Sequence, residues 1–189
     1  MRFSPPLQKS VILAFSGGKD SIACAHFLKF RCRKEVTLLH VNNKLPGDDW
    51  IALRVKTFAD RFGFPIIIEE SESKPTEIDC REARISVFKK YKSVVICHHN
   101  DDVVENYLYN VFRGHSNYIP LRRETYYGDC LVLRPFLKVK GKDIENYLKT
   151  NGLKNWIVED PLSKDSTRGW MRSVLIPVIE RKFNIKGLF

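Results

Sequence analysis

The fold is decided by one stretch near the N-terminus, Val11-Ile12-Leu13-Ala14-Phe15-Ser16-Gly17-Gly18-Lys19-Asp20-Ser21. It begins with a continuous apolar run, residues 11–15, which is typical of a buried strand. Two adjacent glycines then let the backbone turn tightly, and the residues that follow carry apolar side chains at helical spacing. This order of strand, tight loop and helix brings backbone N–H groups and the positive end of a helix together. It therefore predicts an anion-binding site.

The loop also predicts how the anion is bound. Ser16 and Ser21 bring hydroxyl donors, the two glycines bring N–H groups, and Lys19 adds positive charge. Asp20, at the start of the helix, is the candidate ligand for Mg²⁺. The spacing differs from that of the Walker loop and from the dinucleotide fingerprint. We therefore expect a phosphate cradle of another kind at residues 16–21.

Strand and helix patterns alternate along the chain. Strands are expected at residues 11–15, 36–41, 65–69 and 93–97, and helices at 21–30, 48–62, 78–91 and 101–113. Such alternation with apolar strands predicts an α/β fold of the Rossmann-like type, a parallel sheet with helices on both faces. Ligands bind at the carboxyl ends of the strands in such sheets. We therefore expect the chemistry at residues 15–16, 41–42, 69–70 and 98–99.

The pattern weakens between residues 114 and 133. Further helices are expected at 140–151, with Gly152 as the C-terminal stop, and at 170–183. A chain of 189 residues with 43% hydrophobic side chains is long enough for one core. We expect a single domain over residues 1–189, in which 152–189 form a C-terminal helical extension.

Composition bounds the location and the partners. The chain has no apolar run long enough to span a membrane and no secretory signal pattern. We therefore expect a cytoplasmic protein that does not bind a membrane. The five scattered cysteines include no Cys-x-x-Cys pair, which favours reduced thiols. The formal charge of +10 favours a polyanion such as RNA or DNA. Solubility alone explains a basic balance about as well.

Several motifs carry a family resemblance. SGGKDS at residues 16–21 resembles the SGGxDS signature of PP-loop ATP pyrophosphatases, and later motifs are similar to those of the tRNA(Ile)-lysidine synthetases. The resemblance extends from Val11 to Pro177 and implies a PP-loop ATPase fold of the adenine nucleotide alpha hydrolase-like type that uses ATP and Mg²⁺. The later motifs, in family order, are HVNNKL (40–45), REARISVF (81–88), HHNDDVVEN (98–106), RG (113–114), RPFL (134–137) and EDPLSKD (159–165).

The chain also departs from the lysidine synthetase pattern. Asn43 replaces a histidine, Lys44-Leu45 lacks an arginine, and residues 115–117 replace a glycine-rich stretch. The spacing from Asp165 to Arg168 is shorter than in the family. Longer members carry C-terminal domains that help to hold the tRNA, and the resemblance found here does not include them. These departures leave the substrate less fixed than the nucleotide chemistry.

The resemblance implies roles for two acids and a histidine. Asp102 and Glu105 match the pair that recognises free lysine, and their spacing places both carboxylates on one face of a helix. His98, at a strand end, suits orienting an amine or relaying a proton. Taken alone, acids in a first helical turn complement the helix dipole. The motif order favours the lysine-binding and catalytic interpretation for Asp102 and His98.

Basic residues complete the predicted site. Arg84, with Arg81 as the second choice, is expected to hold a phosphate or carboxylate through its planar guanidinium, although a solvated basic helix face is about as common. Arg168 and Arg172, four residues apart, resemble a family pair and are expected to contact pyrophosphate or RNA. The remaining candidates for catalytic residues are Asp20, Arg84, Arg168 and Arg172.

The resemblance implies one reaction and leaves rivals open. In lysidine formation the wobble cytidine of an isoleucine tRNA with a CAU anticodon is adenylated by ATP, and L-lysine then displaces AMP. The alternatives are a tRNA 2-thiolase, a PP-loop ligase for a small molecule, and a non-catalytic RNA-binding domain. The absence of a Cys-x-x-Cys pair disfavours thiolation, and the intact motifs disfavour an idle domain. The sequence leaves open whether the chain forms a homodimer.

Overall fold

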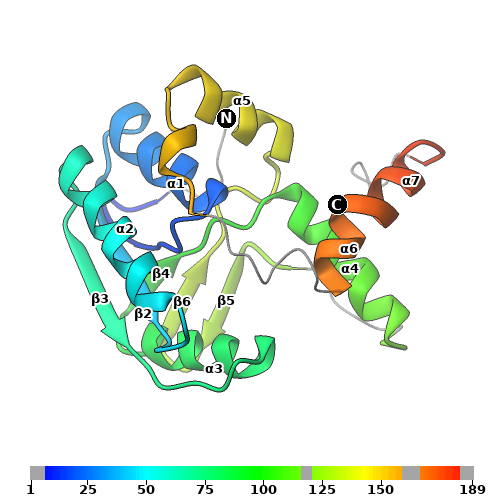
Figure 1. Cartoon of the computed structure of the whole chain (residues 1–189), viewed down its shortest axis with the longest axis horizontal. Helices are drawn as coiled ribbons and strands as arrows, with labels where there is room; N and C mark the ends of the chain where they lie inside the picture. Colours follow the sequence, from blue (N-terminus) through cyan, green and yellow to red (C-terminus); the bar gives the residue numbers. More distant parts are fainter. Residues whose placement is uncertain (1–6, 116–120, 159–166, 184–189) are drawn as a thin grey trace.

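A six-stranded sheet lies at the centre of the computed structural model, which describes residues 7–115, 121–158 and 167–183 (Figure 1). The strand order is β3-β2-β1-β4-β6-β5, and every neighbouring pair is parallel except β5 and β6. This confirms the predicted α/β fold. The strands are β1 (Ser10–Ala14), β2 (Glu35–Asn42), β3 (Ile66–Glu70), β4 (Ser93–Val95), β5 (Glu124–Tyr127) and β6 (Cys130–Leu133).

Helices follow the parallel strands in the predicted order. The long helices are α1 (Lys19–His26), α2 (Asp48–Phe62), α3 (Glu77–Phe88), α4 (Asn100–Phe112) and α5 (Gly141–Thr150). Helix α1 continues into a π-helical turn, η1 (Phe27–Arg31), and α5 ends before Gly152, which has the left-handed backbone of a helix stop. Within the described residues, no helix combines the length and apolar character that a membrane crossing requires.

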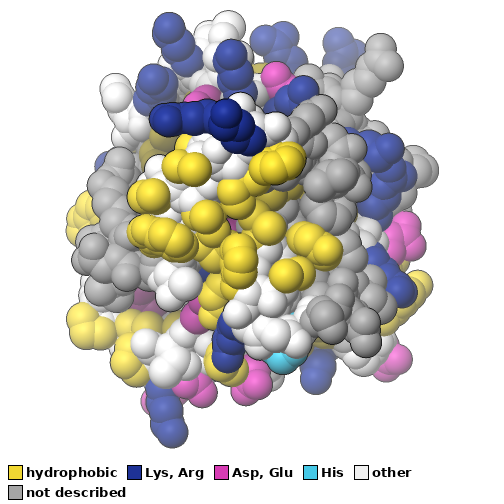
Figure 2. Space-filling view, turned by 90° about the vertical axis from the view of Figure 1, so that its right-hand side faces the viewer, with side chains coloured by type: hydrophobic (Ala, Val, Ile, Leu, Met, Phe, Trp, Pro, Cys, Tyr) yellow, Lys and Arg dark blue, Asp and Glu magenta, His cyan; other side chains and the backbone are white. Residues whose placement is uncertain are grey.

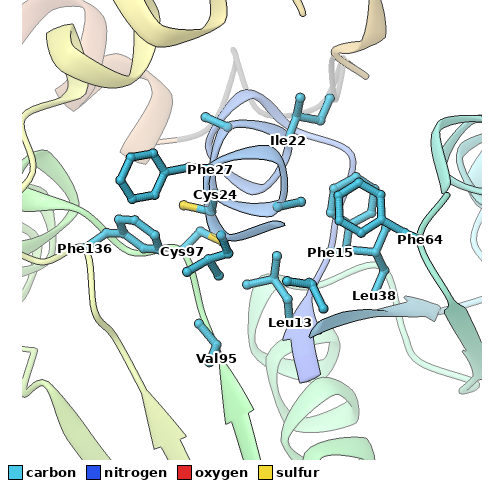
Figure 3. Packing of buried hydrophobic residues seen from close by; sticks show 14 of the residues in the cluster. Leu13, Phe15, Ile22, Cys24, Phe27, Leu38, Phe64, Val95, Cys97 and Phe136 are labelled. Carbon is cyan, nitrogen blue, oxygen red and sulfur yellow. The ribbon is translucent and has the colours of Figure 1, made fainter. Parts of the chain in front are cut away.

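The main core fills the space between one face of the sheet and helices α1, α2 and α5. Alternate residues of β1 and of the segment after it, such as Leu13 and Phe15, point into this core, which also contains Ile22 of α1 (Figure 3). Phe15 stacks on Phe58 of α2, with ring centroids 5.2 Å apart. This packing fixes the point at which β1 ends and the phosphate loop begins.

Helix α3 covers the opposite face of the sheet. Val87 and Phe88 of α3 pack on Leu39, Val94 and Val132 of the strands. The two clusters use alternate residues of the same strands, as the side-chain period of two requires. Helices on both faces, expected from the near-continuous apolar strands, are therefore present.

The C-terminal helices pack beside α4 rather than on the sheet. They are α6 (Thr167–Trp170), the π-helical turn η4 (Met171–Leu175) and α7 (Ile176–Glu180), and a small cluster built around Val104 and Ile176 joins them to α4. Leu153, and the short 3-10 turn η2 (Lys154–Trp156) through Trp156, instead pack with the main core. Leu153, at the start of the stretch expected to form a helical extension, is therefore part of the main core.

Two features differ from the expected sheet. The stretch in which the pattern weakens contains the β5–β6 hairpin, and β5 runs antiparallel at the sheet edge. The hairpin turns at Gly128, whose φ of +61° lies in the left-handed region that suits glycine. Five of the six strands of this sheet are therefore parallel, and the edge strand β5 is the antiparallel arm of a local hairpin.

Candidate active site

The predicted phosphate loop connects β1 to α1 at the centre of the sheet. Gly18 lies at the N-terminus of α1, so the first N–H groups of the helix face the loop. The Ser16 hydroxyl lies 3.3 Å from the Ser21 hydroxyl and accepts the Gly18 N–H at 3.3 Å, while Ser21 donates to the Gly18 carbonyl at 2.9 Å. These contacts hold the two hydroxyls and the helix N-terminus together, which is the arrangement an anion cradle requires.

Gly17 makes the tight turn possible. Its φ is +80°, and a Cβ atom at this position would lie 2.9 Å from Cγ1 of Val55 and 3.0 Å from Cγ2 of Val158. The Gly17 carbonyl also accepts the Val158 N–H at 2.9 Å. A side chain at this position would therefore strain the backbone and push apart α2 and the segment after η2.

Asp20 meets the segment that follows β4. Its Oδ1 lies 3.4 Å from Nε2 of His99, and this His99 nitrogen lies 3.6 Å from Oδ2 of Asp102. The Asp102 carboxylate accepts the backbone N–H of His99 at 2.8 Å, and Nδ1 of the His99 ring accepts the backbone N–H of Asp101 at 3.2 Å. These two bonds cap the N-terminus of α4. Burial lowers the pKa of His99, but the Asp20, Asp102 and Asp101 carboxylates outweigh it and raise the pKa.

His98 has a different environment from its neighbour. Arg134, just after β6, donates from Nε to His98 Nδ1 at 3.2 Å. Burial, together with the charges of Arg134, Arg84 and His99, lowers the pKa of His98 to about 4, although the Asp102 carboxylate opposes this shift. Arg84 donates from Nε to the Cys80 carbonyl within α3. Its positive charge also lowers the pKa of His98, so Arg84 lies near the candidate site.

Glu105 lies buried between α4 and the C-terminal helices, with 1% of its surface exposed. Its Oε1 accepts Nη1 of Arg168 at 2.9 Å, and its Oε2 accepts Nε of Arg172. Arg168 also pairs with Glu77 of α3 at 2.8 Å and stacks over Tyr109, with its guanidinium carbon 4.4 Å from the ring centroid. Both carboxylate oxygens are thus engaged, so a lysine ammonium would have to displace an arginine to reach Glu105.

Arg172 connects this cluster to the phosphate loop. Its Nη2 lies 3.8 Å from Oδ1 of Asp102, and its side chain is 57% exposed. Burial lowers the pKa of Arg172, but the carboxylates of Glu105, Asp102 and Asp20 more than offset this and raise it. Acids from the phosphate loop and from α4 therefore act on one guanidinium.

The structure brings most of the predicted site together but turns one residue away. His99 lies 3.4 Å from Asp20 and 3.6 Å from Asp102, and Ser16 and His98 follow β1 and β4, which are neighbours in the sheet. Lys19 instead pairs with Glu145 of α5 at 3.2 Å, and both side chains are well exposed. The predicted EDPLSKD motif, residues 159–165, lies outside the described residues.

Two residues near the site were not assigned a role from the sequence. His99 bridges Asp20 and Asp102, and Arg134 reaches His98 from the other side. The signal for His99 was its place in the HHNDD run, directly before a helix rich in acids. For Arg134 the only signal was its position in the RPFL motif, because its partner lies 36 residues earlier.

The surroundings of Asp20 fit its predicted role as a ligand of Mg²⁺. Oδ1 of Asp20 is buried and makes no hydrogen bond to the described residues. Mg²⁺ is commonly held by one or two carboxylates together with the phosphates of a nucleotide, so a lone carboxylate beside the loop fits this ion. Among the described residues, no group of three or more histidine, cysteine or acidic side chains gathers as a complete metal cage.

Comparison with family models matches residues 2–179 to the PP-loop domain. The chain belongs to the PP-loop family. The match includes the loop at residues 16–21 and the segment that follows β4, which are the two parts that meet in the structure. The sequence-based resemblance to PP-loop proteins is therefore confirmed.

Curated relatives of this PP-loop chain include enzymes named as tRNA(Ile)-lysidine synthases. The protein from Clostridium perfringens (strain ATCC 13124) is 30% identical over 199 residues, which covers 92% of this chain and 41% of the relative. That from Actinobacillus succinogenes is 30% identical, covering 96% of this chain and 46% of the relative. The bifunctional protein TilS/HprT of Listeria monocytogenes (strain EGD-e) is 30% identical, covering 91% of this chain and 30% of the relative. The chain thus spans less than half the length of these relatives.

Solved structures support the PP-loop fold. The U34-tRNA thiolase NcsA of Methanococcus maripaludis, with its [4Fe-4S] cluster, aligns with a TM-score of 0.74 and 17% identity, covering 94% of this chain and 68% of that one. The NH3-dependent NAD synthetase of Campylobacter jejuni aligns with a TM-score of 0.54 and 20% identity, covering 93% and 77%. At these identities the likeness establishes the architecture.

Proposed function

We propose that this protein is an ATP-dependent tRNA-modifying ligase of the tRNA(Ile)-lysidine synthase type. The observation that carries the proposal is the meeting of two motifs, the phosphate loop and the acids of α4, through the contacts of His99 with Asp20 and Asp102. Curated relatives that align with 92% and 96% of this chain are named tRNA(Ile)-lysidine synthase. The charge of +10 suits a nucleic acid substrate.

The first half-reaction places ATP on the loop. The 2-keto oxygen of the wobble cytidine attacks the α-phosphorus, and the bond to pyrophosphate breaks. The loop N–H groups and the Ser16 and Ser21 hydroxyls lie where they can hold phosphate oxygens as charge develops on them. Mg²⁺, held by Asp20 and the nucleotide, would neutralise part of that charge.

The second half-reaction needs a site for the lysine amine. The ε-amine attacks the activated carbon, AMP leaves, and the amine loses a proton. Asp102 is partly exposed beside the loop, whereas Glu105 is buried and held by two arginines. We propose that Asp102 provides the direct negative charge for the ammonium, and that Glu105 acts on the amine site by holding Arg168 and Arg172 in place.

Thiolation is the second candidate, because the thiolase NcsA shares the fold. An iron–sulfur cluster would need cysteines that converge on one point. Here Cys24 and Cys97 lie in the core on one face of the sheet, whereas Cys130 lies in the cluster on the other face. This distribution favours lysine over sulfur as the second substrate.

The test is lysine transfer. Purified protein with ATP, Mg²⁺, labelled lysine and an isoleucine tRNA with a CAU anticodon should release AMP and incorporate label, and nuclease digestion should yield a modified nucleoside. A matched methionine tRNA should accept less label. Release of AMP without label in any tRNA would contradict lysidine formation but not the PP-loop assignment. Label on a 3′-terminal ester would indicate aminoacylation.

Two variants separate the half-reactions. Asp20→Ala should reduce AMP formation by at least about 100-fold, because it removes the carboxylate beside the phosphates. Asp102→Asn keeps an oxygen that accepts the His99 N–H but removes the charge, so it should raise the KM for lysine more than that for ATP. Equal effects of Asp102→Asn on both substrates would refute the assignment of Asp102 to the amine.

A further inference from the structure

Arg134 is a buried arginine that touches the site from the side of β6. Only 3% of its surface is exposed. Its Nε donates to His98 Nδ1 at 3.2 Å, while Nη1 donates to the Arg122 carbonyl at 3.0 Å and to the Thr125 hydroxyl at 2.8 Å. The bonds to Arg122 and Thr125 tie the guanidinium to the β5 edge. The orientation of Nε toward His98 is therefore set by the hairpin and not by His98 alone.

The bond between Arg134 and His98 determines where the imidazole proton is. A guanidinium has only donors and stays protonated, so the nitrogen it faces must present a lone pair. Nδ1 of His98 is thus the acceptor, and a neutral ring carries its single proton on Nε2. The surrounding charges agree, because Arg134, Arg84 and His99 all disfavour a second proton on His98 and only Asp102 favours one.

We propose that Arg134 is a positioning residue that fixes His98 as a neutral imidazole with its proton on Nε2, so that His98 serves the reaction as a hydrogen-bond donor and not as its base. This refines the expectation that His98 relays a proton. The role in the reaction rests on the proposed function, whereas the position of the proton follows from the Arg134 contact alone.

The proposal has a consequence for the amine step. A ring with Nε2 already protonated and Nδ1 held by Arg134 has no nitrogen available to take the proton that lysine loses. His98 can instead donate to an oxygen on which negative charge develops, such as a phosphate oxygen of the adenylate. The proton acceptor must then be another group, and the Asp102 carboxylate lies in the same cluster.

The direct test is ¹⁵N NMR of the histidine side chains near pH 7. The chain has five histidines, so comparison with His98→Gln assigns the His98 signals. Wild-type protein should show two-bond ¹H–¹⁵N correlations of a neutral ring protonated at Nε2. Arg134→Met should give a mixture of tautomers, and Arg134→Lys, which keeps a charged donor, should restore the wild-type pattern. Thr125→Val is the matched control, because the Arg122 carbonyl still holds Nη1 of Arg134 and the Nε donor to His98 is kept, so the His98 signals should stay unchanged.

Activity provides the second readout. Arg134→Met should lower kcat about 10- to 100-fold with the KM for ATP nearly unchanged, because it misplaces a group without removing a nucleotide contact. A wild-type His98 that is protonated at Nδ1, or doubly protonated, near pH 7 would overturn the proposal. So would an unchanged His98 pattern in a folded Arg134→Met protein. If that variant does not fold, the wild-type and Arg134→Lys spectra decide. The spectra do not depend on turnover, so they separate this proposal from the proposed function.

Discussion

Replacing Glu105 by glutamine distinguishes two roles for this buried acid. The structure places its carboxylate between Arg168 and Arg172, whereas the motif resemblance assigns it to the lysine ammonium. Glutamine keeps the size and one acceptor oxygen but removes the charge. If the structural role dominates, Glu105→Gln should loosen the segment from α6 to α7, because the apolar cluster that holds this segment to α4 is small.

The expected loss can be estimated from the burial of each partner. Breaking a fully buried ion pair costs about 3–5 kcal/mol, because it leaves a charge uncompensated. Arg172 is more than half exposed, so water compensates part of its charge and the full value does not apply. Arg168 is mostly buried and keeps Glu77 as a second partner. We expect a loss of about 2–3 kcal/mol, which is about a 30- to 150-fold increase in local opening.

Hydrogen exchange followed by mass spectrometry measures this opening directly in peptides covering residues 167–183. Glu145→Gln is the matched control, because it removes an exposed carboxylate from a surface pair and should cost less than about 1 kcal/mol. The reasoning is refuted if Glu105→Gln leaves exchange in these peptides unchanged and raises only the KM for lysine. That outcome would mean that Glu105 contacts lysine and that the arginine pairing does not form in solution.

Three further predictions concern the loop, a histidine and the surface. Gly17→Ala should lower stability by about 1–3 kcal/mol in thermal unfolding, whereas Gly18→Ala, at a φ of −70°, should cost less. For His98, the lowered pKa means that folding loses up to about 3 kcal/mol as the pH falls from 6.5 to about 4, because the unfolded chain takes up the proton first. His98→Gln should remove that part of the slope in urea titrations at several pH values. Figure 2 shows hydrophobic side chains gathered on the side of α4 and the C-terminal helices, so Val174→Glu with Val178→Glu should weaken any self-association seen by sedimentation velocity and leave a monomeric protein unchanged.

Much of the fold could be predicted because its signals are local. Helix α2 has the predicted bounds, residues 48–62, since its apolar positions repeat at helical spacing and glycines flank both ends. The phosphate loop was predictable for a similar reason, as two glycines directly after an apolar strand leave few conformations. The β5–β6 hairpin was missed because its strands have only four residues each, although Gly128-Asp129 lies between the strand-favouring residues Thr125–Tyr127 and an apolar run, which is a hairpin signal.

The sequence could name candidate residues for the site, but it could not predict which side chains each of them contacts. The spacing of Asp102 and Glu105 places them on one face of α4, yet one caps the helix at His99 and the other is buried against arginines. That difference depends on where residues 167–183 pack, which is decided by tertiary contacts more than 60 residues away along the chain. The same limit applies to Lys19, whose partner Glu145 comes from α5.

The arrangement of charges explains why these residues act as one unit. Arg172 pairs with Glu105, lies near Asp102, and is also influenced by Asp20, so acids from the phosphate loop and from the proposed amine site share one cation. Residues in one ion-pair network have coupled energies, and a change in the charge of one acid alters how strongly Arg172 is held by the others. A nucleotide bound on the proposed phosphate loop would add negative charge beside Asp20 and so strengthen the competition for Arg172. We therefore expect electrostatic coupling between the proposed phosphate site and the C-terminal helices, through an Arg172 side chain that is more than half exposed.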